Sequence, residues 1–172
     1  IIIRDDGSND LTRIILSQFD TRPNIEVIYG PNIGVVKSFL TLIGKVPPDV
    51  DYVALCDQDD VWNSDKVSRA VSTLVGVSIP TEPAMYCSGY TLVDTALRVI
   101  GQSHELPRKP SLANALVENI ATGCTVVFNK ATVALILGRE PQYCMMHDWW
   151  LYILVSALGT VIYDPHPSLK YR

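Results

Sequence analysis

The first half of the chain alternates short apolar runs with longer segments whose apolar residues recur every three or four positions. The runs at 1–3, 24–29 and 52–56 are typical of buried strands. Apolar residues recur at helical spacing in the segments that follow them, around 11–19, 35–43 and 67–74. This order predicts an α/β fold in which a mixed, mainly parallel sheet is covered by helices on both faces.

The second half continues the pattern less regularly. Strands are predicted at 85–90 and 91–100, with an antiparallel pairing as one option, and again at 125–128 and 160–163. Helices are predicted at 112–117, 130–137 and 148–158, and the proline-containing segment 104–111 is predicted to be a loop. Asn129 is placed to cap the helix that would bury Leu137, and Asn63 or Ser64 to cap the helix at 67–74.

Composition narrows the class of protein. With 172 residues, of which 48% are hydrophobic and 19% charged, the chain fits one compact domain. A net charge of -4 and scattered basic residues argue against a nucleic-acid surface. No run approaches the roughly 20 apolar residues of a membrane span. The cysteines lack metal-site spacing and are interpreted as reduced core residues of a cytosolic protein: Cys56, Cys87, Cys124 and Cys144.

Three aspartates follow the apolar run at 52–56 within four residues. Asp57, Asp59 and Asp60 would repel one another at neutral pH unless a cation or a solvated surface relieves the repulsion. Mg²⁺ binds one or two carboxylates together with substrate phosphate oxygens, so a metal site is one interpretation and a solvated acidic loop is the other. An EF-hand is excluded because Trp62 occupies the sixth loop position, where glycine is needed.

Other acidic residues fall at similar junctions between strands and helices. Asp5 and Asp6 follow the first predicted strand, and Asp148 begins a tryptophan-rich helix. The carboxyl ends of strands line one edge of an open α/β sheet, so these carboxylates can converge on one crevice. The alternative is that Asp6 forms a turn and that Asp148 caps its own helix.

Two glycine-containing turns could approach a ligand. Asn32 and the following glycine precede a helix that carries Lys37 one turn inside, and helix amides with an ammonium group can hold phosphate. Gly123 and Cys124 precede a strand, where glycine would allow close approach of a substrate, although a plain turn is the alternative. Trp62 could stack on a ligand or simply pack in the core.

These motifs together resemble family 2 glycosyltransferases, and more narrowly the bacterial rhamnosyltransferase-like members. The resemblance spans almost the whole chain in the family's order. It rests on Asp5-Asp6-Gly7-Ser8, Asn32-x-Gly34, Asp57-Gln58-Asp59-Asp60-x-Trp62 with Asp65-Lys66, Thr122-Gly123-Cys124, His147-Asp148-Trp149-Trp150 and Tyr171-Arg172.

The resemblance implies a GT-A fold and inverting transfer of a sugar, with rhamnose favoured, from a nucleotide-diphosphate sugar. It implies that Asp6, with Asp5 nearby, reads the pyrimidine base and that Asp57 lies near the ribose. Asp59 would bind Mg²⁺ or Mn²⁺ with the diphosphate, and Asp148 would be the catalytic base. Such a base takes the proton of the acceptor hydroxyl while the metal offsets charge on the diphosphate.

Further residues are assigned to the donor and to the acceptor. We expect Asn32, Lys37 and Gln58 to contact the nucleotide sugar. The sugar or acceptor pocket is expected to contain Trp62, Gly123, Cys124, His147 and Trp149. The donor would be dTDP-rhamnose or a UDP-sugar, and the acceptor a saccharide, lipid-linked in one interpretation, in bacterial cell-surface polysaccharide synthesis. This implies a cytoplasmic protein and leaves open peripheral contact with the inner face of the cell membrane.

The chain departs from the family at both ends. Family members begin with a strand ending in a Pro-x-Tyr-Asn-like motif, and the rhamnosyltransferase pattern continues past Arg172 to a histidine near the metal. We therefore expect residues 1–172 to form a single GT-A domain that lacks its first strand and a C-terminal extension.

Two rival functions stay open. Asp57 to Val61 also fits the start of aspartate-nucleophile phosphatases, in which Asp57 would be phosphorylated, but a late Gly-Asp-x-x-x-Asp motif is missing. The other rival is a truncated or inactive relative that binds a sugar nucleotide or a partner protein without catalysis.

Overall fold

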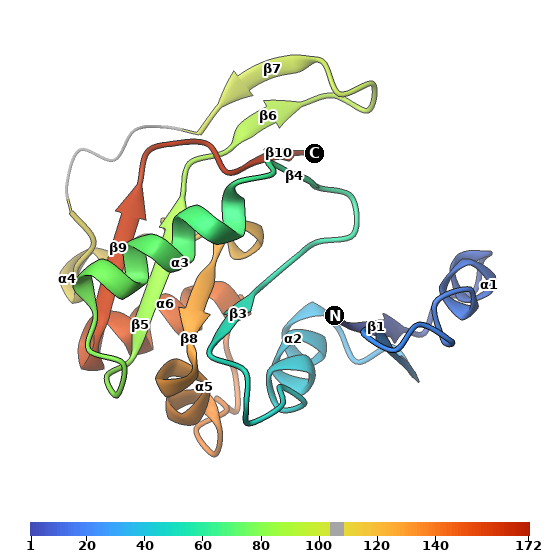
Figure 1. Cartoon of the computed structure of the whole chain (residues 1–172), viewed down its shortest axis with the longest axis horizontal. Helices are drawn as coiled ribbons and strands as arrows, with labels where there is room; N and C mark the ends of the chain where they lie inside the picture. Colours follow the sequence, from blue (N-terminus) through green and yellow to red (C-terminus); the bar gives the residue numbers. More distant parts are fainter. Residues whose placement is uncertain (104–108) are drawn as a thin grey trace.

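The computed structural model describes residues 1–103 and 109–172, so most of the loop predicted at 104–111 lies outside the described residues. Its strands form three sheets that lie side by side in the molecule (Figure 1). The largest has the order β3-β8-β5-β9, with strands β3 (Tyr52–Ala54), β8 (Val127–Asn129), β5 (Ala84–Ser88) and β9 (Thr160–Asp164). β5 and β9 run parallel, whereas β8 runs antiparallel to both β3 and β5.

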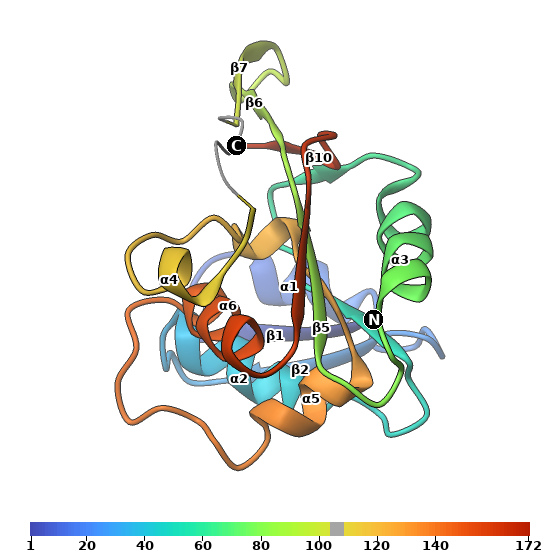
Figure 2. The same ribbon diagram turned by 90° about the vertical axis from the view of Figure 1, so that its left-hand side faces the viewer.

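Both faces of this sheet are covered by helices, as predicted. On one face, Tyr86 and Val127 pack against α3 (Lys66–Val77). On the other, Met85 and Phe128 pack against α2 (Val35–Ile43), α5 (Lys130–Ile136) and α6 (His147–Leu158). Neighbouring side chains of β5 thus pack into the cores on opposite faces of the sheet, as expected for a strand buried on both sides. Figure 2 shows α3 on one side of β5 and α6 on the other.

The N-terminal unit, residues 1–30, forms a separate sheet. β1 (Ile2–Asp6) pairs in parallel with β2 (Glu26–Gly30), and α1 (Thr12–Ser17) connects them. The apolar face predicted for the first helix is present in the sequence but is not covered, since Leu11 is 68% exposed and Ile14 63% exposed. Figure 1 shows this unit at one end of the molecule, away from β5 and β9.

A third sheet, with the order β4-β10-β6-β7, was only partly predicted. β6 (Thr91–Val93) and β7 (Val99–Gln102) are antiparallel and shorter than the predicted strand at 91–100. β4 (Val61–Trp62) and β10 (Leu169–Tyr171) were not predicted, because two or three residues give too short a pattern. The helix predicted at 112–117 is the single turn α4 (Leu112–Ala115).

One of the predicted helix caps was confirmed and another was wrong. Asn129 caps α5 by accepting a hydrogen bond from Thr132 N–H at 3.0 Å, as expected. The cap proposed for α3 was wrong, because the Asn63 amide donates to the Pro167 carbonyl and Asp65 occupies the cap position. Leu137 is 45% exposed because α5 ends at Ile136, one residue too early to turn Leu137 inward.

Candidate functional site

The acidic loop after β3 gathers two of its three aspartates around a cysteine from another segment. Carboxylate oxygens of Asp57 and Asp60 and the Cys124 sulfur all lie within 4.8 Å of one another. Asp59 is not in this group; its backbone carbonyl accepts a hydrogen bond from Arg172 Nε at 2.7 Å. The short helical turn η1 (Gly123–Thr125) brings Cys124 to the loop.

The pKa of Asp57 reports what surrounds its carboxyl group. Burial raises that pKa above its usual value, and repulsion from Asp60, Asp59 and Asp148 raises it further. Asp148 lies 91 positions further along the chain, on α6. Its charge nevertheless acts on Asp57, and the Gly123 N–H that it accepts belongs to the residue next to Cys124 of the cluster.

The donor set of this cluster fits a hard divalent cation through its carboxylates. Oδ2 of Asp60 is buried and has no hydrogen-bond partner within the described residues, so it is an acceptor in need of a donor or a cation. The Cys124 thiol fits less well, because burial and the neighbouring Asp60 raise its pKa and keep it protonated. Asp57 and Asp60 would therefore hold Mg²⁺ or Mn²⁺, which prefer oxygen ligands.

Lys66 supplies a positive charge next to the acidic loop. Its side chain is buried, its ammonium group donates to the Cys124 carbonyl at 2.6 Å, and it lies 4.5 Å from the centre of the Trp62 ring. Burial lowers the pKa of Lys66 to about 8, partly opposed by Asp60 and Asp57. A lysine at the first position of α3 thus joins the acidic loop to the Gly123–Cys124 turn.

Asp148 lies in the first turn of α6, but Met146 is the capping residue of that helix. One Asp148 carboxylate oxygen accepts the Trp149 N–H at 2.7 Å, and the other reaches across to the Gly123 N–H at 2.8 Å. A side chain on Gly123 would meet Asp148 Oδ2 at 3.3 Å and His147 Nε2 at 3.2 Å, so the glycine permits this approach. The tertiary contact explains the aspartate better than helix capping does.

His147 lies beside Asp148 and is buried. Its ring stacks on Phe39 with the ring centres 4.0 Å apart. Burial lowers the pKa of His147, against the opposing effect of Asp148, so the ring is neutral. Neither ring nitrogen has a hydrogen-bond partner among the described residues.

Asp5 and Asp6 both make contacts inside the N-terminal unit and its neighbouring loop. Asp5 is buried, pairs with Arg13 at 2.7 Å and accepts the Ser8 N–H. Asp6 accepts the backbone N–H groups of Ile33 and Gly34 at 2.8 and 2.9 Å and forms an ion pair with Arg4. These hydrogen bonds lower the pKa of Asp6 to about 2, with the Ile33 N–H as the largest cause. The carboxylate of Asp6 therefore holds the loop that precedes α2.

Only some of the donor-site candidates line the cavity of about 530 Å³ next to β1. Asp6, Asp57 and Gln58 line it, so the turn after β1 and the loop after β3 face one space. Lys37 and Asn32 are exposed, and neither is among the residues lining this cavity. The two amides just ahead of α2 are already bound by Asp6, which leaves less of that helix end available to a phosphate than predicted.

The aromatic candidates divide between two surroundings. Trp62 lines an apolar cavity between β1 and β3 and has its ring next to the Lys66 ammonium. The Trp149 indole N–H donates to the Ala115 carbonyl at 2.7 Å, and its ring packs against the core. Trp149 thus has a packing role in this structure, whereas Trp62 borders a cavity.

Sequence reasoning gave no role to three charged residues of the site. Asp60 was seen only as part of an acidic run, Lys66 only as part of a family motif, and Arg4 not at all. Arg4 is almost wholly buried and bonds to Ser38 Oγ at 2.8 Å and to the Pro31 carbonyl at 2.9 Å. The available signal was weak, since an arginine inside an apolar strand pattern only indicates that a partner for its charge is needed.

The cysteines are all free, and their burial differs from the prediction. Cys87 and Cys124 are buried, but Cys56 is exposed, so its assignment to the core was wrong. The reason is that β3 ends at Ala54 and Cys56 already belongs to the acidic loop.

Comparison with known proteins gives one consistent result. Residues 1–76, which include the acidic loop, match the family described as glycosyl transferase family 2. The chain is 30% identical to a dTDP-rhamnosyl transferase, RfbG, of Shigella flexneri over 190 aligned positions, covering 100% of the chain and 62% of the relative. The family match over Asp57–Val61 favours a glycosyltransferase loop over the phosphatase motif.

Solved structures share the fold at low sequence identity. A structure of S. aureus TarS 1-349 in complex with UDP is 15% identical, with a TM-score of 0.68 over 99% of the chain and 50% of TarS 1-349. A second TarS structure is 13% identical, with a TM-score of 0.67 over 98% of the chain and 30% of that protein. The predicted GT-A fold is thereby confirmed. In the part of the chain that the structure describes, no helix has the length and apolar character needed to cross a membrane.

Proposed function

We propose that this chain, whose residues 1–76 match the glycosyl transferase family 2 model, is a glycosyltransferase that transfers a sugar from a nucleotide-diphosphate sugar to a saccharide acceptor with inversion. One observation carries the proposal. Asp148 of α6 accepts the Gly123 N–H at 2.8 Å, and the next residue, Cys124, has its sulfur within 4.8 Å of carboxylate oxygens of Asp57 and Asp60. In this proposal, carboxylates of the loop after β3 bind a metal beside the leaving diphosphate, and the carboxylate on α6 accepts the proton of the acceptor hydroxyl.

Asp148 is the general base in this proposal. An inverting transfer needs a carboxylate that accepts the proton of the attacking hydroxyl on the face opposite the leaving diphosphate. The Gly123 and Trp149 N–H groups fix both oxygens of Asp148, and the neutral His147 ring packs against Phe39 beside it. A carboxylate held by two backbone donors keeps one orientation toward an acceptor.

Asp57 and Asp60 are the proposed ligands of Mg²⁺ or Mn²⁺. When bound, the ion would offset negative charge on the leaving diphosphate. Asp59, the ligand expected from the resemblance, contributes its backbone carbonyl to Arg172, and its carboxylate is outside the ligand cluster. We therefore assign the metal to Asp57 and Asp60 and keep Asp59 as the competing assignment.

The donor proposal follows the relatives. A relative is a dTDP-rhamnosyl transferase and a structural neighbour holds UDP, so we propose a pyrimidine nucleotide sugar, with dTDP-rhamnose as the first choice. We propose a saccharide acceptor, lipid-linked at the cytoplasmic face of the membrane, in bacterial cell-surface polysaccharide synthesis. The shared cavity lined by Asp6, Asp57 and Gln58 is the proposed donor end of the site.

The test is sugar transfer by the full-length protein, with dTDP-rhamnose and UDP-sugars screened by mass spectrometry. Asp148→Asn should lower turnover by at least about 10²-fold while nucleotide binding, measured by thermal shift with Mn²⁺, is retained. Glu118→Gln, which changes another carboxylate outside the cluster, is the matched control and should turn over normally. Nucleotide binding without any transfer would favour an inactive relative, and equal turnover by the Asp148 variant would refute the base assignment.

A further inference from the structure

Lys66 is a buried charged residue to which the proposed mechanism gives no part. It is the first residue of α3, shortly after the acidic loop, and only 1% of it is exposed. Taking an ammonium group out of water disfavours folding, and an apolar side chain of similar length would fill the same space without that penalty. The charge of Lys66 therefore indicates a role beyond packing.

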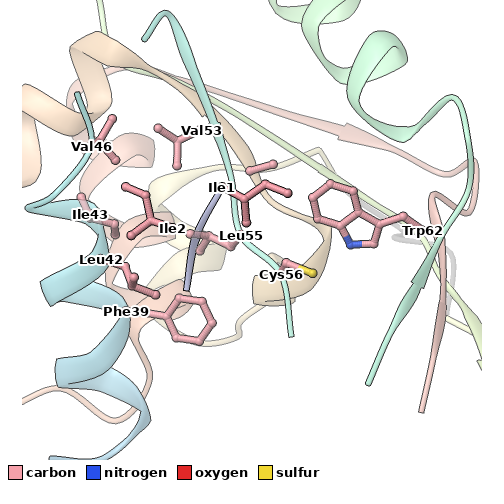
Figure 3. Close-up of a pocket in the computed structure, with 11 residues that line it drawn as sticks. Ile1, Ile2, Phe39, Leu42, Ile43, Val46, Val53, Leu55, Cys56 and Trp62 are labelled. Atoms are coloured by element: carbon pink, nitrogen blue, oxygen red, sulfur yellow. The ribbon is translucent and has the colours of Figure 1, made fainter. Parts of the chain in front are cut away.

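The ammonium group of Lys66 contacts an aromatic ring and a backbone carbonyl. The centre of the Trp62 ring lies 4.5 Å from Nζ, a distance at which the face of an indole attracts a cation. Figure 3 shows this ring bordering the apolar cavity between β1 and β3. Nζ also donates a hydrogen bond to the Cys124 carbonyl at 2.6 Å. The two contacts together fix the position of the ammonium group.

The carbonyl that Lys66 holds belongs to the short turn η1. The carbonyls of Thr122 and Gly123 each accept the backbone N–H three residues further on, at 2.8 and 3.0 Å. The next carbonyl, that of Cys124, accepts from Lys66 instead. A buried carbonyl without a donor destabilises a fold, so Lys66 supplies a hydrogen bond that the turn does not supply for itself.

The same turn holds the proposed base. The N–H of Gly123, one residue before the carbonyl that Lys66 holds, donates to Asp148 at 2.8 Å. A single 3-10 turn is tightly wound, so a shift at the Cys124 carbonyl also moves the Gly123 N–H. Lys66 on α3 is thus linked to the carboxylate on α6 by two hydrogen bonds of one turn.

We propose that Lys66 is a positioning residue for Asp148: by holding η1, it keeps the Gly123 N–H, and with it the Asp148 carboxylate, oriented toward the acceptor hydroxyl. This inference rests on the proposed function, in which Asp148 is the base. A misplacement of about 1 Å at a reacting group can cost about 10²-fold in rate. Because Lys66 begins the helix that follows the acidic loop, the same contact ties that loop to the base.

NMR couplings across hydrogen bonds in the full-length protein test the inference without any turnover. In the native protein, we expect a coupling from Lys66 Nζ to the Cys124 carbonyl carbon and one from the Gly123 nitrogen to the Asp148 carboxyl carbon. In Lys66→Met, the Gly123–Asp148 coupling should be lost. Turnover should show a kcat at least about tenfold lower with a donor KM within about twofold of the native value, because the lost contact orients the base and does not bind the donor.

Two results would overturn the inference. One is a Gly123–Asp148 coupling of native size in Lys66→Met; tighter Mn²⁺ binding by such a variant would mean that Lys66 only offsets the charge of the acidic loop. The other is the absence of the Lys66–Cys124 coupling in the native protein, which can be checked even where the variant does not fold.

Arg69→Met is the matched control on the same helix. Arg69 lies three residues after Lys66, and its Nε pairs with Asp164 of β9 at 2.5 Å. This variant should keep the Gly123–Asp148 coupling and the native kcat. Equal losses in both variants would mean that any weakening of α3 disturbs the base, and would overturn a specific role of Lys66. Absence of sugar transfer by the native protein would instead refute the proposed function, and the couplings would still decide what Lys66 holds.

Discussion

The central sheet and the N-terminal unit differ in how far they bury their apolar residues. Tyr86 and Phe128 of the central sheet are fully buried between helices, whereas Leu11 and Ile14 of the N-terminal unit are more than half exposed. Hydrophobic burial stabilises the first region, and polar contacts such as the Asp6 bonds to Ile33 and Gly34 organise the second. The proposed base belongs to the packed region, and part of the donor end belongs to the weakly packed one.

The proposed base and the nucleotide end of the site are therefore held by different kinds of contact. Asp148 and the Gly123 turn are fixed by buried neighbours on α6 and in the core, so their geometry does not require the N-terminal unit. The turn after β1 is held instead by polar contacts, among them the Ile33 and Gly34 N–H groups that donate to Asp6. We infer that packing holds the proposed base in place, whereas hydrogen bonds of Asp6 hold the nucleotide end of the site.

The largest expected effect comes from removing a core side chain on one side of the comparison. Phe128→Ala should lower the free energy of unfolding by about 3–5 kcal/mol, because it leaves a cavity among well-packed neighbours. Ile14→Ala should lower it by less than about 0.5 kcal/mol, since the side chain is 63% exposed. Urea unfolding of both variants measures the difference. Similar losses would show that the two regions are equally packed.

The buried lysine of the packed region predicts a pH dependence. The pKa of Lys66 is about 8 in the folded chain, below its ordinary value of 10.5, so between these values the unfolded chain binds more protons. The free energy of unfolding of the native protein relative to Lys66→Met should therefore rise by about 3 kcal/mol between pH 7 and pH 10.5. Denaturant unfolding of both proteins across this range checks it. A constant difference would mean that Lys66 has an ordinary pKa.

The metal assignment predicts a smaller change within the acidic loop. Asp60→Ala should weaken Mn²⁺ binding in the presence of UDP at least about tenfold, or about 1.4 kcal/mol, because it removes a ligand. Asp59→Ala is the matched variant one position away and should weaken binding less. Electron paramagnetic resonance of free Mn²⁺ gives both affinities. The reverse order would restore Asp59 as the ligand.

In the weakly packed N-terminal unit, we expect the contribution of Asp6 to stability to change only at acid pH. Its pKa is lowered to about 2, so its contribution to stability is present above the ordinary value of 3.8 and is lost as the pH falls toward 2. Asp6→Asn should therefore be less stable than the native protein at pH 6, and the difference should shrink at pH 2. Thermal unfolding at both pH values measures this. A difference that persists at pH 2 would point to a packing role.

Much of the fold could be predicted from the sequence because its strands and helices are periodic. The alternation of β5, with Met85 facing one core and Tyr86 the other, and the Asn129 cap both follow from local pattern. The same pattern could not show that the apolar face around Ile14 stays exposed. Amphipathic spacing indicates that a face can be buried but does not identify what covers it.

The candidate site was predictable in its acidic segments and less so in its exact members. Asp57 and Asp148 could be brought together by the rule that strand ends share one edge. That Asp60 and not Asp59 lies in the cluster with Asp57 and Cys124 could not be predicted, because adjacent residues of a loop point in directions that only the backbone sets. Lys66 could not be placed either, since its burial depends on the Cys124 carbonyl, 58 positions away.

The central claim is that the carboxylate of α6 and the acidic loop after β3 share one site. The most direct measurement is the carboxyl titration of Asp57 by carbon NMR in the native protein and in Asp148→Asn. We expect a raised pKa for Asp57 in the native protein and a lower one in the variant, because one source of repulsion is gone. An Asp57 pKa that is the same in both proteins would contradict the shared site.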